Sequence, residues 1–292
     1  MCTLGKGGCM QPFAMNQYSQ STYQQCLVDS IVKAVNPEMI FLLGAAVYHR
    51  SSKSIFQTSA AVSQYITDYI LLVLLENLDN REPHEWQDKI ENRGMPVTSI
   101  VLSVYTFNEW LKAGHRFAVN VQQSAEIIYD LGKHPLQGSS TATPHDEQIG
   151  IEKYWRDGIT KAKEFLAGSE LYRIRKQYAM AAFMLHQSAE QSLHTLLKVG
   201  TGYHANTHNI DRLLRYAGLV SDQLSNIFPQ KTEADKQMFH LLQKAYSDAR
   251  YKADYIISYD QLLCLTEKVR SMHEVLSDFR SAKLSGGHVA YA

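Results

Sequence analysis

An arginine and a lysine stand two residues apart in the segment DARYKADY of the C-terminal half. A guanidinium donates hydrogen bonds in a planar fork that fits phosphate oxygens, so one interpretation is that Arg250 and Lys252 face a phosphate in a groove between helices or in a dimer. The same segment also fits a helix surface whose charges neutralise each other. Opposite charges lie four residues apart at Arg250–Asp254, Lys244–Asp248 and Asp248–Lys252. The sequence leaves both interpretations open.

Histidines and one glutamate form a second group. His186, Glu190 and His194 follow at intervals of four, so a helix places them on one ridge. Such a ridge can bind a metal when a second helix adds a ligand. We expect instead that these residues brace a bundle through hydrogen bonds, and we predict no metal site and no cofactor. His208, in NTHNI, either braces the start of a helix or supplies a base to a neighbouring site.

The composition limits the classes of function. The 292 residues include 29 basic and 29 acidic side chains, so any nucleic-acid contact must come from a local patch, and nothing favours DNA. The longest apolar run, residues 69–75, is far shorter than the roughly 20 residues of a membrane span. The N-terminus lacks the apolar block of a secretory signal. No C-x-x-C spacing occurs, so free thiols in the cytoplasm are expected at Cys2, Cys9, Cys26 and Cys264.

These groups must be positioned by two halves of different character. The stretch between the halves is rich in proline, glycine and small hydroxyl residues and has no helical or strand period, which predicts a linker. The sequence therefore predicts a flexible leader at 1–15, a first domain at 16–131, a linker at 132–148, a helical domain at 149–283 and a tail at 284–292.

The first domain alternates helical and extended patterns. Thr106 and Glu109 have capping-box spacing, so a helix is expected directly after the third strand. The predicted elements are a helix at 18–35 and buried strands at 38–44, 65–75 and 97–105. This half is therefore α+β with a small mixed sheet.

The second domain is all helical. Residues 178–197 carry apolar side chains at steps of four and three, which predicts an amphipathic helix. We expect three further helices: one opened by Thr207 or Asn209 and ended near Gly218, one capped by Thr232 and running through Tyr246 and Ala249, and a last one opened by Ser258 and Gln261. Short connections between such helices predict an up-and-down bundle.

Several motifs of the helical domain resemble the HEPN domain. They are FMLHQSAEQ, TGY, THNI and KAYSDARYKADY, and with the last helix they cover about residues 150–283. The resemblance implies a bundle that pairs into homodimers, often beside a minimal nucleotidyltransferase domain. Glu190 matches an acid that is common in this family. Tyr203 of TGY is expected to pack the bend that Gly202 allows.

Many HEPN domains are ribonucleases with an Arg-x(4–6)-His motif, in which arginine stabilises phosphate charge and histidine transfers protons. Arg250 stands at the arginine position. The histidine positions hold Tyr255, Ile256 and Ile257. A phenol, with a pKa of about 10, shuttles protons poorly at pH 7, so the resemblance argues against cleavage by that mechanism.

The first domain resembles a degenerate nucleotidyltransferase. In that family a strand ends in Gly-Ser at the triphosphate, and carboxylates on neighbouring strands bind two metal ions. Here Gly44 is followed by alanine, and Asp68 has Ile70 where the second acid belongs. Only Ser99 and Ser103 stand where the third acid is expected. One carboxylate cannot hold two divalent cations, so the resemblance implies an inactive domain in which Gly44 and Asp68 keep at most a nucleotide contact.

Three functions follow as hypotheses. In the first, a homodimeric HEPN bundle binds nucleotide or RNA through Arg250, Lys252, His208 and Glu190. In the second, the chain is an enzyme: either a ribonuclease of a toxin–antitoxin or defence system that uses Arg250 with His208 from outside the usual motif, or a nucleotidyltransferase that uses acids outside the family's pattern. In the third, the chain is a structural interaction module.

Overall fold

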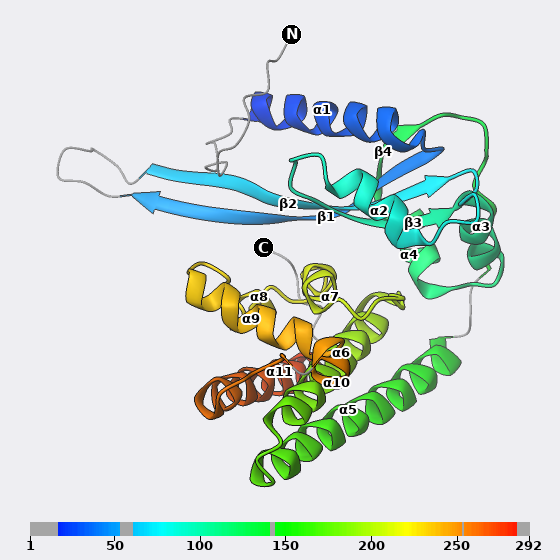
Figure 1. Ribbon diagram of the computed structural model, residues 1–292. Helices are drawn as coiled ribbons and strands as arrows, with labels where there is room; N and C mark the ends of the chain where they lie inside the picture. Colours follow the sequence, from blue (N-terminus) through cyan, green and yellow to red (C-terminus); the bar gives the residue numbers. More distant parts are fainter. Residues whose placement is uncertain (1–16, 53–60, 141–143, 253, 285–292) are drawn as a thin grey trace. The chain divides into compact units, whose positions relative to one another are not determined.

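The protein is α+β, and its structure is a computed structural model that describes residues 17–52, 61–140, 144–252 and 254–284 (Figure 1). It divides into two compact units. The first comprises the residues up to Leu111 together with Val121–Gly138, and the second comprises Lys112–Asn120 together with the residues from Ser139 onward. The predicted leader, nearly all of the predicted tail, Cys2 and Cys9 lie outside the described residues. Cys26 and Cys264 are free and exposed.

The first unit is built on a four-stranded mixed sheet of order β3-β2-β1-β4. Strand β2 pairs parallel to β3, whereas β1 pairs antiparallel to both β2 and β4. The strands are β1 (Met39–Ser52), β2 (Ala61–Leu75), β3 (Val97–Ser103) and β4 (Glu126–Asp130). Figure 1 shows β1 and β2 as a long two-stranded ribbon that extends from the sheet.

The expectation that the first strand ends at Gly44 is wrong. Gly44 pairs with Ile70 inside the ribbon, and β1 continues to Ser52. The ladder shifts register between Leu42 and Gly44 and again between Ala46 and Val47. Glycine weakens a strand locally and often marks a bulge, but β2 supplies backbone partners on the far side of it, so the strand resumes.

Helices cover both faces of this sheet. On one face, α1 (Gln17–Val35) contributes Leu27 and Ile31, and α2 (Pro83–Glu91) contributes Ile90, to a core that includes Leu71 and Val73. On the other face, Phe107 of α3 (Val104–Lys112) contacts Phe41 of β1, with ring centroids 5.8 Å apart. All residues from Tyr69 to Leu75 are buried, as the continuous apolar run predicted.

The start of α3 differs from the prediction. The helix begins at Val104, and the hydroxyl of Ser103 accepts the backbone N–H of Thr106 at 3.0 Å. Ser103 therefore takes the capping position that the sequence assigned to Thr106, because β3 ends two residues earlier than expected.

The second unit is a helix bundle around α6 (Tyr178–Thr201). The predicted apolar stripe of α6 is confirmed, since Ala182, Leu185, Ala189 and Leu193 are fully buried. The other helices are α4 (Arg116–Ser124, of which Arg116–Asn120 belongs here), α5 (Pro144–Ile174), α7 (Ile210–Ala217), α8 (Gln223–Ile227), α9 (Glu233–Ala245), α10 (Asp248–Tyr251) and α11 (Tyr259–Leu284). None of the described helices is long and apolar enough to cross a membrane.

Side-chain caps open three of these helices. Asn209, rather than Thr207, caps α7 by accepting the N–H of Arg212 at 3.1 Å. Thr232 forms a capping box with Asp235 at the start of α9. Ser258 and Gln261 exchange hydrogen bonds before α11, as predicted.

The predicted helix through Tyr246 and Ala249 is interrupted. Helix α9 ends at Ala245, and α10 is a single turn from Asp248 to Tyr251. At the break, the hydroxyl of Ser247 donates to the carboxylate of Asp248 at 2.6 Å. Short polar side chains of this kind favour local bonds over helix continuation.

The end of α6 depends on Gly202. This glycine has a φ of +86°, and a Cβ at its position would lie 2.8 Å from the backbone nitrogen of Phe117. Beside it, the guanidinium of Arg116 donates to the backbone carbonyls of Lys198 and Val199 in the last turn of α6. Tyr203 is buried against Phe117, with ring centroids 4.9 Å apart, which confirms that it packs the bend.

Candidate functional site

The carboxylate of Glu190 is the centre of a histidine cluster on α6. His186 and His194 lie one turn to either side, with Nδ1 of His186 3.5 Å and Nε2 of His194 3.9 Å from the carboxylate. His208, from the segment before α7, brings its Nδ1 to 2.9 Å from Oε1 of Glu190. A carboxylate only accepts, so Nδ1 of His208 carries a proton, and in the neutral imidazole Nε2 is then the acceptor.

Burial separates the roles of these histidines. The His186 side chain is fully buried, and burial lowers its pKa to about 3, with further contributions from His208 and Arg250. Burial likewise lowers the pKa of His194 to about 4, helped by His204. Both rings are therefore neutral near pH 7. His208 is 59% exposed and is the member of the cluster that solvent reaches.

Arg250 lies over aromatic rings. Its guanidinium carbon is 4.9 Å from the ring centre of Phe183, 4.7 Å from that of Tyr246 and 4.8 Å from that of Tyr251. Its Nε donates to the backbone carbonyl of Tyr246 at 2.9 Å. The ring of Tyr246 also stacks on His208 at 4.5 Å, with 15° between the planes. Arg250 and His208 thus both pack on the ring of the same tyrosine.

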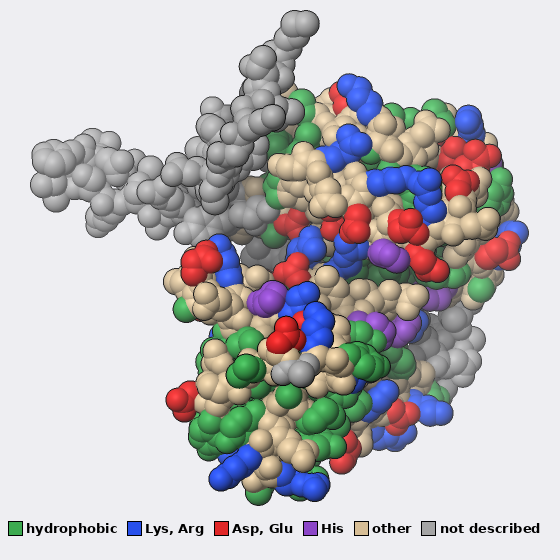
Figure 2. All heavy atoms as spheres, in the orientation of Figure 1, with side chains coloured by type: hydrophobic (Ala, Val, Ile, Leu, Met, Phe, Trp, Pro, Cys, Tyr) green, Lys and Arg blue, Asp and Glu red, His purple; other side chains and the backbone are tan. Residues whose placement is uncertain are grey.

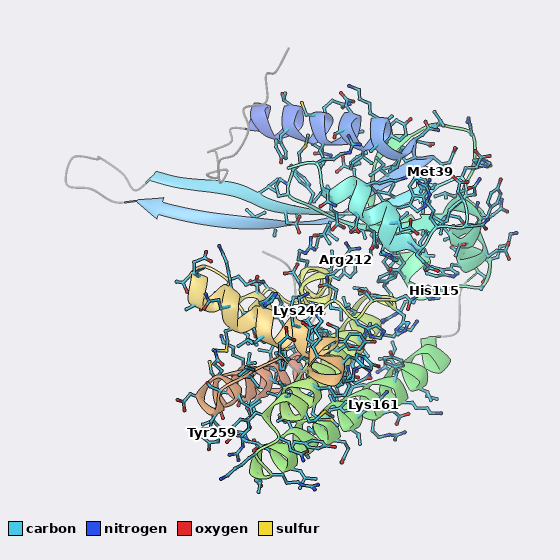
Figure 3. The ribbon with its side chains drawn as sticks, in the orientation of Figure 1. Met39, His115, Lys161, Arg212, Lys244 and Tyr259 are labelled. Atoms are coloured by element: carbon cyan, nitrogen blue, oxygen red, sulfur yellow. The ribbon has the colours of Figure 1, made fainter. Side chains whose placement is uncertain are left out.

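We call Arg250, His208, Glu190, Tyr246 and Tyr251 the Arg250 surface. Arg250 is exposed, and Tyr251 is 77% exposed. Lys244, labelled in Figure 3, lies on α9 two residues before Tyr246. Figure 2 shows acidic and basic side chains interspersed on the face turned to the viewer, in keeping with the balanced composition. A specific phosphate contact therefore depends on individual side chains such as Arg250.

The charge pairs predicted for this segment form only in part. Lys252 does pair with Asp248, at 3.1 Å. The hydrogen bond from Ser247, followed by that from Lys252, holds the pKa of Asp248 below its usual range. The prediction that Arg250 pairs with Asp254 along one helix is wrong. Helix α10 ends at Tyr251, and the guanidinium of Arg250 packs on the aromatic rings instead.

Two of the three residues at the histidine positions of the ribonuclease motif, Tyr255 and Ile257, are structural. The hydroxyl of Tyr255 donates to the carbonyl of Leu241 at 2.9 Å, and burial raises the pKa of this phenol. Ile257 is buried. Ile256 is 79% exposed and adds apolar area two residues before the cap of α11 at Ser258.

The candidate residues of the first unit serve its framework. The carboxylate of Asp68 accepts a hydrogen bond of 2.6 Å from the hydroxyl of Thr98 on the neighbouring strand. Ser99, at the position of the third acid, donates its hydroxyl and its backbone N–H to Glu91, each at 2.9 Å. Gly44 lies within β1, close to Asp68 because Ala46 pairs with Asp68. These bonds tie β2, β3 and α2 together.

Sequence reasoning missed the aromatic part of the Arg250 surface. The sequence placed Tyr246 on the apolar stripe of a continuous helix and gave no role to the rings of Phe183 and Tyr251. A signal was present: Tyr246 and Arg250 are four residues apart, a spacing at which a guanidinium can reach a ring on the same helical surface.

Comparison with known proteins agrees with this architecture. The family model for the HEPN domain matches residues 155–279, which covers most of α5 and extends to α11. This segment is therefore a HEPN domain, and the resemblance seen in its motifs is confirmed there. The match does not include the sheet of the first unit. A search of curated proteins found no match.

Proposed function

We propose that the HEPN domain binds RNA or a nucleotide at the Arg250 surface. The observation that carries this proposal is the ring of Tyr246, which contacts the guanidinium of Arg250 and the imidazole of His208 together. Arg250 also contacts the exposed ring of Tyr251, and the imidazole of His208 is held by Glu190, so these groups are connected through Arg250 and Tyr246. A HEPN domain is consistent with a function related to RNA or nucleotides.

Each group suits a part of such a ligand. The guanidinium of Arg250 can donate to phosphate oxygens while its plane stays on the rings. The exposed ring of Tyr251 offers a stacking face for an unpaired base. Lys252 is held by Asp248, so it contributes less charge than predicted. With few free cations engaged, binding is expected to weaken only moderately with salt.

A second candidate function is RNA cleavage without a metal ion. The specific observation in its favour is the contact of 2.9 Å between His208 and Glu190. With Nδ1 held by the carboxylate, Nε2 of His208 takes the proton of a ribose 2′-hydroxyl, whose oxygen attacks the adjacent phosphorus. Arg250 stabilises the charge on phosphate, and the 5′-oxygen leaves with a proton from solvent. In this mechanism His208 takes the role of the histidine that is missing from the Arg-x(4–6)-His motif.

The remaining predictions are kept as proposals. We propose a homodimer formed through the bundle, supported by exposed apolar side chains on α5 such as Leu171 and Ile174. We also retain the degenerate nucleotidyltransferase-like character of the first unit, where the engagement of Asp68 by Thr98 supports a framework role. A role in a toxin–antitoxin or defence system is a further hypothesis. The alternative is a purely structural interaction module, which would be favoured if the protein neither binds RNA or nucleotide nor cleaves RNA in the experiments below.

Binding is tested by fluorescence anisotropy with labelled single-stranded RNA and with ATP as competitor. Loss of a charge-assisted hydrogen bond to phosphate corresponds to about 1.5–3 kcal/mol, so Arg250→Ala is expected to raise Kd roughly 10- to 100-fold. The matched control is Arg156→Ala, which removes an arginine that is 71% exposed on α5. Equal affinities of Arg250→Ala and the wild type would contradict the proposal.

Cleavage is tested by incubating RNA with protein and EDTA. The expected product carries a 2′,3′-cyclic phosphate and disappears in His208→Ala, whereas His240→Ala, an exposed histidine of α9, retains activity. Glu190→Gln is expected to reduce the rate, because the amide cannot stabilise the imidazolium that forms. Cleavage that persists in His208→Ala refutes the assignment of His208, and RNA binding without any cleavage leaves the first function alone.

A further inference from the structure

Three strand ends meet at one edge of the sheet in the first unit. Because β1 runs antiparallel to both β2 and β4, the start of β1 lies beside the ends of the other two strands. Glu38 precedes β1, and its backbone N–H donates to Leu74 of β2 at 2.8 Å. Its carbonyl accepts the N–H of Leu131, the residue after β4, at 2.9 Å. Met39, labelled in Figure 3, marks this edge.

The carboxylate of Glu38 is buried without a hydrogen bond. The residue is 1% exposed, and neither oxygen has a hydrogen-bond partner among the described residues. An isolated buried carboxylate is costly, and proteins compensate such a charge with a cation or with donors. Because no donor contacts the carboxylate of Glu38 among the described residues, a cation bound beside it would compensate its charge.

Two further ligand groups face this carboxylate. Glu76 directly follows β2, and His134 lies four residues after β4; with Glu38 they offer one oxygen or nitrogen atom each within 4.8 Å of one another. Gly132, with a φ of +78°, and a bond from its N–H to Asp130 turn the chain so that His134 returns to the edge. Nε2 of His134 lies 3.9 Å from Glu38, too far for a hydrogen bond but suited to a shared ion.

We propose that Glu38, Glu76 and His134 bind a divalent transition-metal ion of the Zn²⁺ or Mn²⁺ type. Two carboxylates and one imidazole form a mixed oxygen and nitrogen ligand set that suits these ions, whereas Mg²⁺ and Ca²⁺ favour oxygen ligands alone. Bonds of about 2.1 Å to one ion draw the three donor atoms slightly closer together. Glu76 is exposed and His134 is half-buried, so the ion can enter from solvent.

The ion acts on stability and leaves room for further ligands. It ties the start of β1 to the ends of β2 and β4 and balances the charge of Glu38. Three protein ligands leave at least one coordination position for water or for an oxygen of a bound molecule. This site lies in the first unit and is independent of the function proposed for the Arg250 surface.

The test is metal binding by the full chain. Because the chain has 12 histidines, the wild type is compared with variants rather than judged by total uptake. With Co²⁺ as a spectroscopic substitute for Zn²⁺, the wild type is expected to bind one more ion per chain than Glu38→Gln, Glu76→Gln or His134→Gln, with visible absorption bands that are lost in each variant. Glu76 is exposed, so Glu76→Gln tests the site without disturbing the core.

Matched controls are Glu126→Gln, an exposed glutamate at the opposite end of β4, and His240→Gln on α9. Both are expected to bind Co²⁺ as the wild type does. Thermal unfolding adds a second readout: Zn²⁺ raises Tm of the wild type but not of Glu38→Gln, while without metal Glu38→Gln is at least as stable as the wild type. Equal stoichiometry and spectra in the wild type and Glu76→Gln would overturn the proposal.

Discussion

The buried histidine beneath the Arg250 surface predicts a specific loss of stability in acid. His186 is fully buried, and its pKa is lowered from 6.5 to about 3. In the unfolded chain it takes up a proton near pH 6.5, whereas in the folded protein it stays neutral until about pH 3. Between these values the unfolded state binds more protons, so stability falls as the pH is lowered.

The size of the loss in the free energy of unfolding follows from the pH range between the unfolded and folded pKa values of His186. Each pH unit below the unfolded pKa costs about 1.36 kcal/mol while the folded group remains neutral. At pH 5 His186 therefore lowers the free energy of unfolding by about 2 kcal/mol relative to pH 7.5. His194, with its pKa lowered to about 4, adds a similar loss over a narrower window.

His186→Phe isolates the effect. The aromatic ring of His186 packs at 5.2 Å from Tyr246, and its Nε2 has no hydrogen-bond partner among the described residues, so an apolar ring suits the position. Urea unfolding followed by circular dichroism at pH 7.5 and pH 5.0 measures the pH difference, from which any constant cost of the larger ring cancels.

We expect the loss between the two pH values to be about 2 kcal/mol smaller in His186→Phe than in the wild type. His240→Gln, which changes an exposed histidine of α9, keeps the wild-type difference. If His186→Phe shows the same pH difference as the wild type, then His186 is not held neutral by burial in the folded protein.

Two further predictions concern the framework. Gly202→Ala is expected to destabilise the protein by about 2–4 kcal/mol, because it adds strain at positive φ and a contact of 2.8 Å with Phe117. Gly94→Ala, at a φ of +75° in open space, should cost only the strain, about 1–2 kcal/mol, and equal losses in urea unfolding would contradict the packing argument. Thr98→Val should cost about 1–3 kcal/mol by removing a hydrogen bond to Asp68, with nucleotide affinity unchanged; a large loss of affinity would contradict the framework role of Asp68.

Local patterns predicted much of the helical unit. The stripe of α6, the capping box of Thr232 and the exchange between Ser258 and Gln261 follow from the geometry of a single helix or of one of its ends. The motifs around Glu190 and Arg250 identified the HEPN domain for the same reason, since they are contiguous in the chain. Ridge neighbours such as His186 and Glu190 were also predictable, because a helix brings residues four apart together.

Local sequence patterns did not predict features that depend on contacts between distant or adjoining segments, such as the extent of β1 and the end of α9. The continuation of β1 past Gly44 depends on backbone partners from β2, and no local signal outweighs the glycine there. The end of α9 at Ala245 also escaped prediction, because an apolar stripe continues through Tyr246 while the bond between Ser247 and Asp248 redirects the chain.

The sequence by itself determined the residue types and the helical periodicity that place Arg250, Glu190 and His208 in a HEPN bundle. Only the tertiary structure decided that Tyr246 joins Arg250 to His208, and that Glu38, Glu76 and His134 converge at one sheet edge. Sequence periodicity fixes which side of a helix or strand a residue occupies. Contacts between distant segments arise from how the elements pack and pair, which depends on the whole fold.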